Sequence, residues 1–118
     1  MVTNPKRKNA NRDTAGAIEI GDDLEIRTTT HRAAGAGTWV IGTVAGHRFE
    51  ALVFPEHAEC PDFELGHSRI SKLWLQRIAD KTTVVNFDRG WDHHPANPTA
   101  AAIVDFLAAG LAERTYGK

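Results

Sequence analysis

Two runs of alternating apolar and polar residues, joined by a very short segment that contains glycine, constrain the fold of this chain most. The runs are Thr38 to Val44 and Arg48 to Phe54, and the sequence Ala45-Gly46-His47 separates them. In the second run, apolar residues occupy every other position, which places them on one face of a strand: Phe49, Ala51 and Val53. This pattern predicts a β-hairpin with one buried face.

Three further segments carry strand patterns. Apolar residues follow a loose two-residue period from Ile18 to Ile26, interrupted by a turn at Gly21-Asp22-Asp23. The segments Arg69 to Ile78 and Thr82 to Asp88 are separated by only Ala79-Asp80-Lys81. We therefore expect these two segments to form a second antiparallel pair, with the long loop 55–67 between the hairpins.

The last element is predicted to be a helix. Asn97 is a suitable N-cap, Pro98 suits the first helical position, and an Ala- and Leu-rich segment continues to about Arg114. Apolar residues at three- and four-residue spacing form one stripe along it: Ile103, Phe106, Leu107 and Leu111. The sequence thus predicts an α+β fold, an antiparallel β-meander of four to five strands with one C-terminal helix packed on a face.

Composition indicates an ordinary globular domain preceded by a basic arm. The chain has 118 residues, 42% of them hydrophobic, and a formal net charge of −1, which does not predict a nucleic-acid partner. Residues 1–16 are polar and basic and are expected to be a disordered arm, followed by a single domain over 17–118. Cys60 is the one cysteine, which fits a reducing cytoplasm. We see no secretory signal and no apolar run near the ~20 residues that span a bilayer, so we expect no membrane contact.

The segment from Asn86 to Pro95 is rich in chemically active side chains. As an alternative to a non-catalytic protein, four of them could serve a small metal-dependent or acid–base hydrolase: Asp88, Asp92, His93 and His94. Adjacent histidines rarely converge on one metal ion, because ligating histidines are usually spaced by three residues or more. We therefore favour a structural interpretation, a strand end followed by a turn, and expect no catalytic residue here.

The long loop holds a second candidate cluster. His57, Cys60 and His67 have a spacing that a zinc site permits, and Asp62 and Glu64 lie between them. No second pair of closely spaced ligands accompanies them, so the pattern favours an acidic surface loop. We expect neither a metal nor another cofactor.

Basic residues give a third class of function, nucleic-acid binding. The arm supplies Lys6, Arg7 and Lys8. The predicted second hairpin supplies Arg69, Arg77 and Lys81, with Trp74 or Trp91 available for base stacking.

Two motifs together resemble a known group of proteins. Arg69-Ile70-Ser71-Lys72-Leu73 is followed by Val84-Val85-Asn86-Phe87-Asp88-Arg89-Gly90-Trp91-Asp92, and both come after the spaced pattern from Trp39 to Ala51. Over about residues 38–110, the chain resembles a family of uncharacterised small domains carried by phages, plasmids and other mobile elements. The resemblance implies context rather than chemistry.

That context leads to our first hypothesis for function. We expect a small non-enzymatic accessory binding protein of a phage or mobile element that binds a protein or nucleoprotein partner, with counter-defence against a host machine as one such role. The motif residues would form either fold determinants or the contact surface: Lys72, Asp88, Arg89, Trp91 and Asp92.

Two finer expectations concern exposed or buried apolar groups. We expect Trp91 to be largely buried against the sheet, because Gly90 lets the chain turn tightly beside it. The apolar surface of the helix extends past its main stripe and predicts a symmetric homodimer through this helix, unless the alanines only reflect helix propensity. The residues concerned are Ala101, Val104, Ala108 and Ala112.

Overall fold

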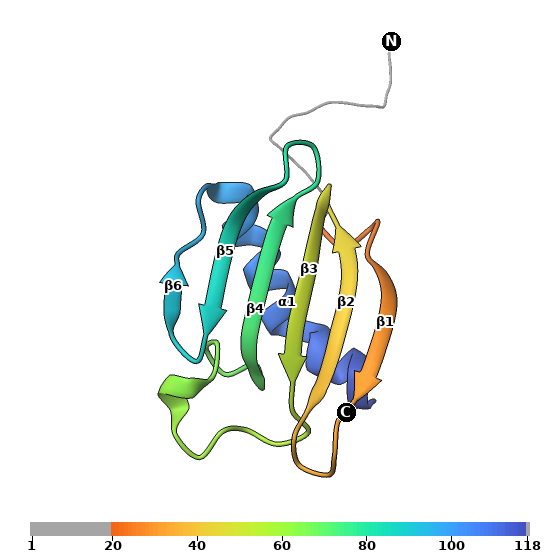
Figure 1. The fold of residues 1–118 in the computed structure, drawn as a ribbon, viewed down its shortest axis with the longest axis vertical. Coiled ribbons are helices and arrows are strands. Elements are labelled where there is room, and N and C mark those ends of the chain that lie inside the picture. The colour runs from red at the N-terminus through yellow and green to blue at the C-terminus, as the bar shows by residue number, and fades with distance from the viewer. Residues whose placement is uncertain (1–19, 118) are drawn as a thin grey trace.

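A computed structural model describes residues 20–117 and has the architecture of one antiparallel sheet with one helix on it (Figure 1). The sheet has six strands in the order β1-β2-β3-β4-β5-β6, and every neighbouring pair is antiparallel. The strands are β1 (Glu25–His31), β2 (Thr38–Val44), β3 (His47–Val53), β4 (Ile70–Arg77), β5 (Thr82–Asp88) and β6 (Trp91–His93). A short 3-10 helix, η1 (Pro61–Phe63), lies in the long loop, and α1 (Pro98–Tyr116) follows the sheet.

The α+β prediction is confirmed, but the number of strands was underestimated. The sixth strand, β6, is only three residues long and follows directly after the Asp88-to-Gly90 turn, where the sequence predicted that pairing ends. The first strand also differs from the prediction, since β1 begins at Glu25 and continues through Thr28 to His31. Its exposed edge position explains the weak apolar pattern, because all seven of its residues are exposed. The predicted arm and Ile18 lie outside the described residues.

The predicted β2–β3 hairpin is present, with a tight turn that differs by one residue from the expected one. Thr38 pairs with Val53 and Val44 pairs with His47, so only Ala45 and Gly46 form the loop. Both loop residues have positive φ, 51° and 74°, which is the backbone geometry of the turns that match the twist of paired strands.

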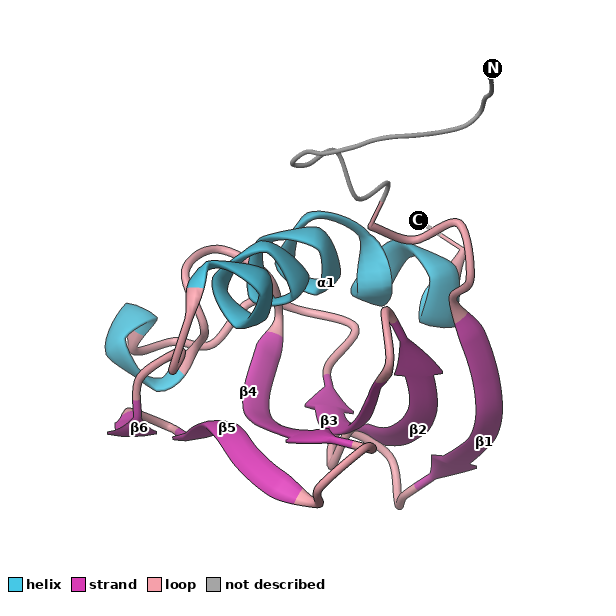
Figure 2. Ribbon diagram, turned by 90° about the horizontal axis from the view of Figure 1, so that it is seen from above, coloured by secondary structure: helices cyan, strands magenta, loops and turns pink. Residues whose placement is uncertain are grey.

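The core lies between the concave face of the sheet and α1 (Figure 2). Alternate residues of the central strands point to this face, and α1 presents Ile103, Leu107 and Leu111, each no more than 1% exposed. The predicted N-cap is confirmed, because the Asn97 side chain accepts a hydrogen bond from the backbone N–H of Ala100. These contacts explain why a 19-residue helix forms: capping satisfies its first turn, and core packing stabilises the rest.

The Ala-rich flank of α1 is partly used inside the molecule. Val104 and Ala112 are 6% and 2% exposed and belong to the core, whereas Ala101 and Ala108 are half-buried. The homodimer through this helix stays a prediction, and the surface left for it on this flank is small. None of the described residues forms a helix long and apolar enough to cross a membrane.

Candidate functional site

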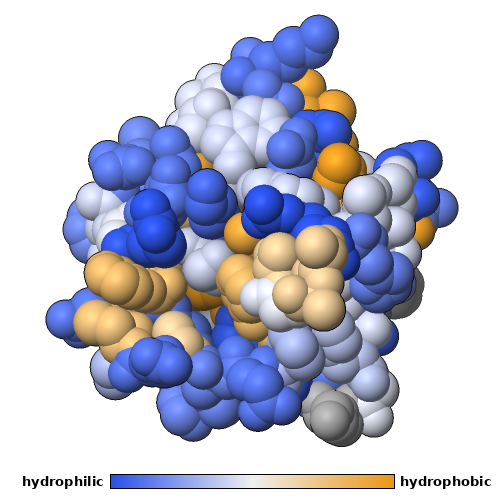
Figure 3. Space-filling view, turned by 60° about the horizontal axis from the view of Figure 1, so that its bottom comes forward, coloured by the Kyte–Doolittle hydropathy of each residue, from blue (hydrophilic) through white to orange (hydrophobic). Residues whose placement is uncertain are grey.

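A pocket of about 550 Å³ lies at the end of the sheet where β3 ends and β4 begins. It is bounded by the β1–β2 loop, the long loop from Phe54 to Arg69 and the β5–β6 turn. Figure 3 faces this end of the molecule and shows hydrophobic residues in and beside the hollow, with hydrophilic residues around them. Its apolar lining comes from Leu52, Phe54, Pro55 and Phe63.

Close packing of the backbone shapes one wall of this pocket. A Cβ atom on Gly37 would lie 2.9 Å from the carbonyl oxygen of Val53, so only glycine allows the β1–β2 loop to approach β3 this closely. The same loop is closed by a hydrogen bond from the Arg32 N–H to the Gly37 carbonyl oxygen, 3.0 Å. These two contacts place the Arg32 side chain at the pocket.

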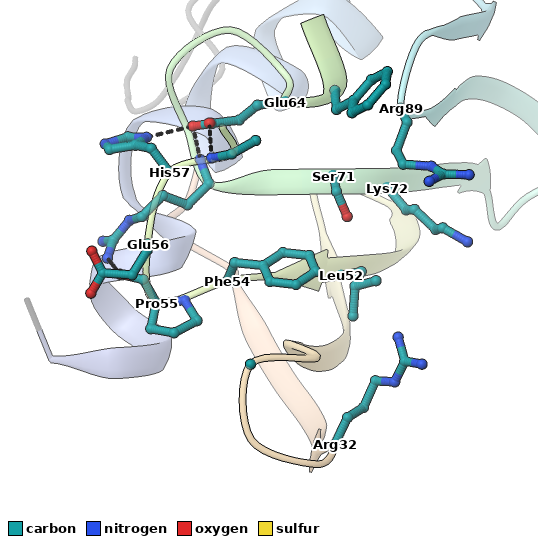
Figure 4. Close-up of a pocket in the computed structure, with 14 residues that line it drawn as sticks. Arg32, Leu52, Phe54, Pro55, Glu56, His57, Glu64, Ser71, Lys72 and Arg89 are labelled. Atoms are coloured by element: carbon teal, nitrogen blue, oxygen red, sulfur yellow. Dashed lines mark hydrogen bonds and ion pairs between the residues drawn. The ribbon is translucent and has the colours of Figure 1, made fainter. Parts of the chain in front are cut away.

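Three cationic side chains, Arg32, Lys72 and Arg89, lie along one side of the pocket (Figure 4). Pairing of β4 with β5 sets Lys72 opposite Asp88, with 3.7 Å between the ammonium nitrogen and a carboxylate oxygen. Arg89 has a positive φ of 54°, and its backbone N–H donates to the Ser71 carbonyl oxygen at 2.8 Å. Its guanidinium lies 5.8 Å from the ring centre of Phe63 and 4.0 Å from Asp88. One carboxylate therefore faces two of the three cations.

Glu64 lies on the opposite side of the pocket, with Pro55, Glu56 and His57, and its side chain is only 4% exposed. Its carboxylate accepts hydrogen bonds from the backbone N–H groups of Ala58, 2.9 Å, and Arg69, 2.5 Å, and from Nδ1 of His57, 2.6 Å. Burial alone raises the pKa of Glu64, but these hydrogen bonds and the charge of His57 together lower it below its ordinary value. The expectation of an acidic surface loop is therefore wrong for Glu64. The loop folds around this carboxylate.

Two of the three candidate metal ligands meet beside this carboxylate. The imidazoles of His57 and His67 stack with 3.8 Å between ring centres, and one ligand atom from each of His57, Glu64 and His67 lies within 4.8 Å of the others. Cys60 is exposed and is not part of this group. The group therefore contains the buried carboxylate of Glu64 in place of the Cys60 thiol that the sequence suggested.

The residues of the alternative hydrolase are placed along β5, β6 and the segment after it. Asp88 ends β5 and faces Lys72, whereas Asp92 and His93 are exposed on β6. Nδ1 of His93 donates to the carbonyl oxygen of His94, 2.8 Å, and the His94 ring stacks on Trp91. Within residues 20–117, these four side chains do not form a group whose ligand atoms converge.

Trp91 is 37% exposed, so the prediction that it is largely buried is wrong. Its ring contacts Phe87 edge-on at 5.2 Å and stacks on His94 at 4.8 Å, between ring centres. The physical reason is its position in β6, a three-residue strand at the edge of the sheet, with no neighbour on its outer side among the described residues.

The basic residues considered for nucleic-acid binding are not gathered on one surface among the described residues. Arg69 bonds the carbonyl oxygen of Pro55 and lies 3.6 Å from Glu113, both near the pocket end of β4. Arg77 and Lys81 lie at the other end of this eight-residue strand, which is roughly 25 Å away at ~3.3 Å per residue. Lys6, Arg7 and Lys8 lie outside the described residues.

Comparison with protein families places these features in a known group. The model of a domain of unknown function, DUF7678, matches residues 38–112, which run from the start of β2 into α1. The chain belongs to the DUF7678 family. The matched segment contains both motifs from which the sequence predicted membership of an uncharacterised small-domain family, and that prediction is confirmed. No curated protein and no solved structure matches the chain.

The DUF7678 match omits part of the pocket. Leu52, Glu64, Lys72 and Arg89 lie within residues 38–112, but Arg32 lies before them in the β1–β2 loop. Sequence reasoning found Lys72 and Arg89 from their motifs and did not find Arg32, Leu52, Phe54 or Phe63. These residues come together only through the order of the strands, which no local pattern records.

Proposed function

We propose that this DUF7678 protein is a non-enzymatic accessory binding protein that holds an acidic, partly apolar segment of a partner in the pocket beside Lys72. The proposal is supported most by the pocket lining, which is apolar in one part and positively charged along one side. Leu52, Phe54 and Phe63 supply an apolar lining, and three cationic side chains lie along one side.

The charges along the side of the pocket that Arg32, Lys72 and Arg89 line favour an anionic ligand, whereas Glu56 and Glu64 are among its other lining residues. Lys72 and Arg89 are 38% and 62% exposed at the side chain, so a ligand can reach them without unfolding the protein. Asp88 faces both of them, at 3.7 and 4.0 Å, and so compensates one of the positive charges at most. A carboxylate of a ligand would meet the remaining positive charge, and it would do so beside apolar surface, where ionic attraction is stronger than in bulk water.

The lining favours an apolar group next to that carboxylate. Phe63 is 48% exposed although it is a large hydrophobic residue, and Phe54 also lines the pocket. An aromatic or aliphatic side chain in the hollow would remove this surface from water, which gives roughly 25 cal/mol for each Å² buried. Peptides with an aliphatic or aromatic residue between acidic ones have both properties.

The biological setting is part of the same proposal. The resemblance of the motifs to small domains of phages and plasmids supports an accessory protein of a mobile element, acting in the cytoplasm on a host protein or nucleoprotein machine. Blocking such a machine, as counter-defence, requires binding alone. The alternative hydrolase needs Asp88, Asp92, His93 and His94 to act together, and their separate placement favours the binding proposal.

Fluorescence anisotropy with labelled peptides tests this proposal on the full chain. The first peptide carries Phe between acidic residues, the second has Lys at each acidic position, and the third has Ala in place of Phe. We expect the first to bind, the second not to bind, and the third to bind more weakly. The double variant Lys72→Glu with Arg89→Glu should lower the affinity for the first peptide by about tenfold or more at low salt, because two attractive charges become repulsive.

The matched control is Lys81→Glu, which reverses one charge at the far end of β4 and should leave the affinity unchanged. Equal losses in the control and in the pocket variant would overturn the proposal. Equal binding of the acidic and basic peptides, or no binding of any peptide, would overturn it as well.

A further inference from the structure

The long loop brings two imidazoles and one carboxylate to a single point, although the sequence favours no metal. We propose that His57, Glu64 and His67 bind one divalent transition-metal ion, for which Zn²⁺ is the best match. Their candidate ligand atoms all lie within 4.8 Å of one another. Two nitrogen donors and one carboxylate oxygen form a common three-residue zinc ligand set, which leaves one coordination position open.

Glu64 is already held in the orientation that a ligand needs. The Ala58 N–H donates to Oε2 at 2.9 Å, and the Arg69 N–H donates to Oε1 at 2.5 Å. Such outer hydrogen bonds fix a ligating carboxylate and are a regular part of metal sites. Because the side chain is 4% exposed, a cation beside it is only weakly screened by solvent.

The two histidines have the freedom that coordination requires. His57 has a 44% exposed side chain and His67 is exposed, so both rings can turn from their stacked arrangement toward a shared ion. Nδ1 of His57 donates a hydrogen bond to Oε1 of Glu64, with 2.6 Å between the two atoms. Coordination through this nitrogen requires that the hydrogen move to Nε2 in a neutral imidazole, or leave to solvent from a protonated one.

Coordination would also join the two ends of the long loop. His57 follows the end of β3 by four residues, and His67 precedes the start of β4 by three. An ion held by both would fix the intervening segment, which includes η1 and Phe63 of the pocket wall. Binding of the ion does not depend on the peptide ligand of the proposed function.

Titration of the purified full chain tests the site. After treatment with a chelator, the protein is titrated with Zn²⁺ by calorimetry, and with Co²⁺ as a spectroscopic probe. We expect one ion for each chain, a melting temperature that rises with Zn²⁺, and a cobalt spectrum without the charge-transfer band of a thiolate ligand. His67→Ala and His57→Ala should each lower the affinity for Zn²⁺ by at least about 100-fold. Loss of an outer-shell partner costs up to about this much, and loss of a direct ligand should cost no less. Circular dichroism checks that both variants are folded.

Two control variants separate this site from other ligands. Cys60→Ser removes the thiol of the same loop, and His94→Ala removes an exposed histidine beside Trp91. Both should bind Zn²⁺ as tightly as the wild type. The proposal is overturned if the wild type binds no Zn²⁺ at one equivalent, if either loop-histidine variant binds it as tightly as the wild type does, or if Cys60→Ser abolishes binding.

Discussion

The hydroxyl group of Tyr116 lies 2.8 Å from the carbonyl oxygen of Val53 and 2.9 Å from Oγ1 of Thr38. It connects the end of α1 to the end of β3 and to the start of β2. All three groups are satisfied when Tyr116 donates to Val53 and accepts from Thr38, whose oxygen in turn accepts from Nδ1 of His31 at 2.8 Å. The last turn of the helix is thus fixed to the sheet by one polar chain in addition to apolar packing.

Tyr116→Phe should therefore lower the free energy of unfolding by about 1–3 kcal/mol. The ring still packs, but the Val53 carbonyl and the Thr38 hydroxyl each lose one hydrogen-bond partner, and each such loss in a mostly buried site costs about 0.5–1.5 kcal/mol. Urea unfolding followed by circular dichroism measures the change. An unchanged midpoint would mean that water replaces the hydroxyl at no cost.

Two glycine-to-alanine substitutions should have opposite effects. A Cβ atom at Gly42 would collide with the Glu25 carbonyl oxygen and lie 2.9 Å from the Phe49 ring, so Gly42→Ala should destabilise by about 1–3 kcal/mol. A Cβ atom at Gly110, inside α1, would have the side-chain Nε of Arg114 as its nearest neighbour beyond the helix backbone, at 3.9 Å. Gly110→Ala should therefore stabilise by about 0.5–1 kcal/mol through helix propensity. Parallel urea curves compare the two variants, and effects of the same sign would contradict the close packing at Gly42 or the open space at Gly110.

Trp91→Ala should cost about 1–2 kcal/mol, because Trp91 is 37% exposed and its ring contacts the rings of Phe87 and His94 at the edge of the sheet. Phe49→Ala is the matched comparison, since Phe49 is 0% exposed and removal of a core aromatic costs ~3–5 kcal/mol. If chemical denaturation shows the same loss in free energy of unfolding for both variants, Trp91 stabilises the fold more than its exposure indicates. A small loss together with weakened peptide binding would extend the binding surface from the pocket to β6.

Asp80 should titrate at unusually low pH. Hydrogen bonds from the Arg77 guanidinium, at 2.9 and 3.1 Å, and from the Thr82 N–H, at 3.1 Å, hold the pKa of Asp80 well below its ordinary value of 3.8. Because the folded-state pKa is the lower one, this ion pair stabilises the protein above about pH 4 and loses its effect as the pH falls through the folded-state pKa. Carboxyl-carbon NMR measures the titration, and Arg77→Gln should move the pKa of Asp80 upward. A midpoint near 3.8 in the wild type would show that the pair does not persist in solution.

Elements that depend on local sequence were predictable. The β2–β3 hairpin follows from alternation around Ala45-Gly46, and the start of α1 follows from Asn97 and Pro98. In both cases, neighbouring residues carry the physical cause of the structure. Errors arose where the cause is distant, as for Trp91, whose exposure depends on the absence of a seventh strand beside β6 in the described sheet.

The candidate sites show the same division. Lys72 and Arg89 were found because each belongs to a sequence motif, whereas Arg32 and Leu52 join them only through strand order. For Glu64 the sequence predicted the wrong environment, since an acidic residue in an acidic loop is usually exposed. It is buried because two backbone N–H groups of its own loop satisfy it, and charge patterns do not report such contacts.

The order of the strands in the sheet has a consequence for protein synthesis. Each strand pairs with the one made just before it, so the whole sheet can assemble by successive hairpins as the chain leaves the ribosome. The cover of its concave face, α1, is made after all six of these strands, and its 19 residues take about one to four seconds at ~5–20 residues per second. During that interval, the nascent sheet presents its apolar face to solvent and to other chains. Chaperone capture and truncation products should therefore concentrate on chains that stop before Pro98.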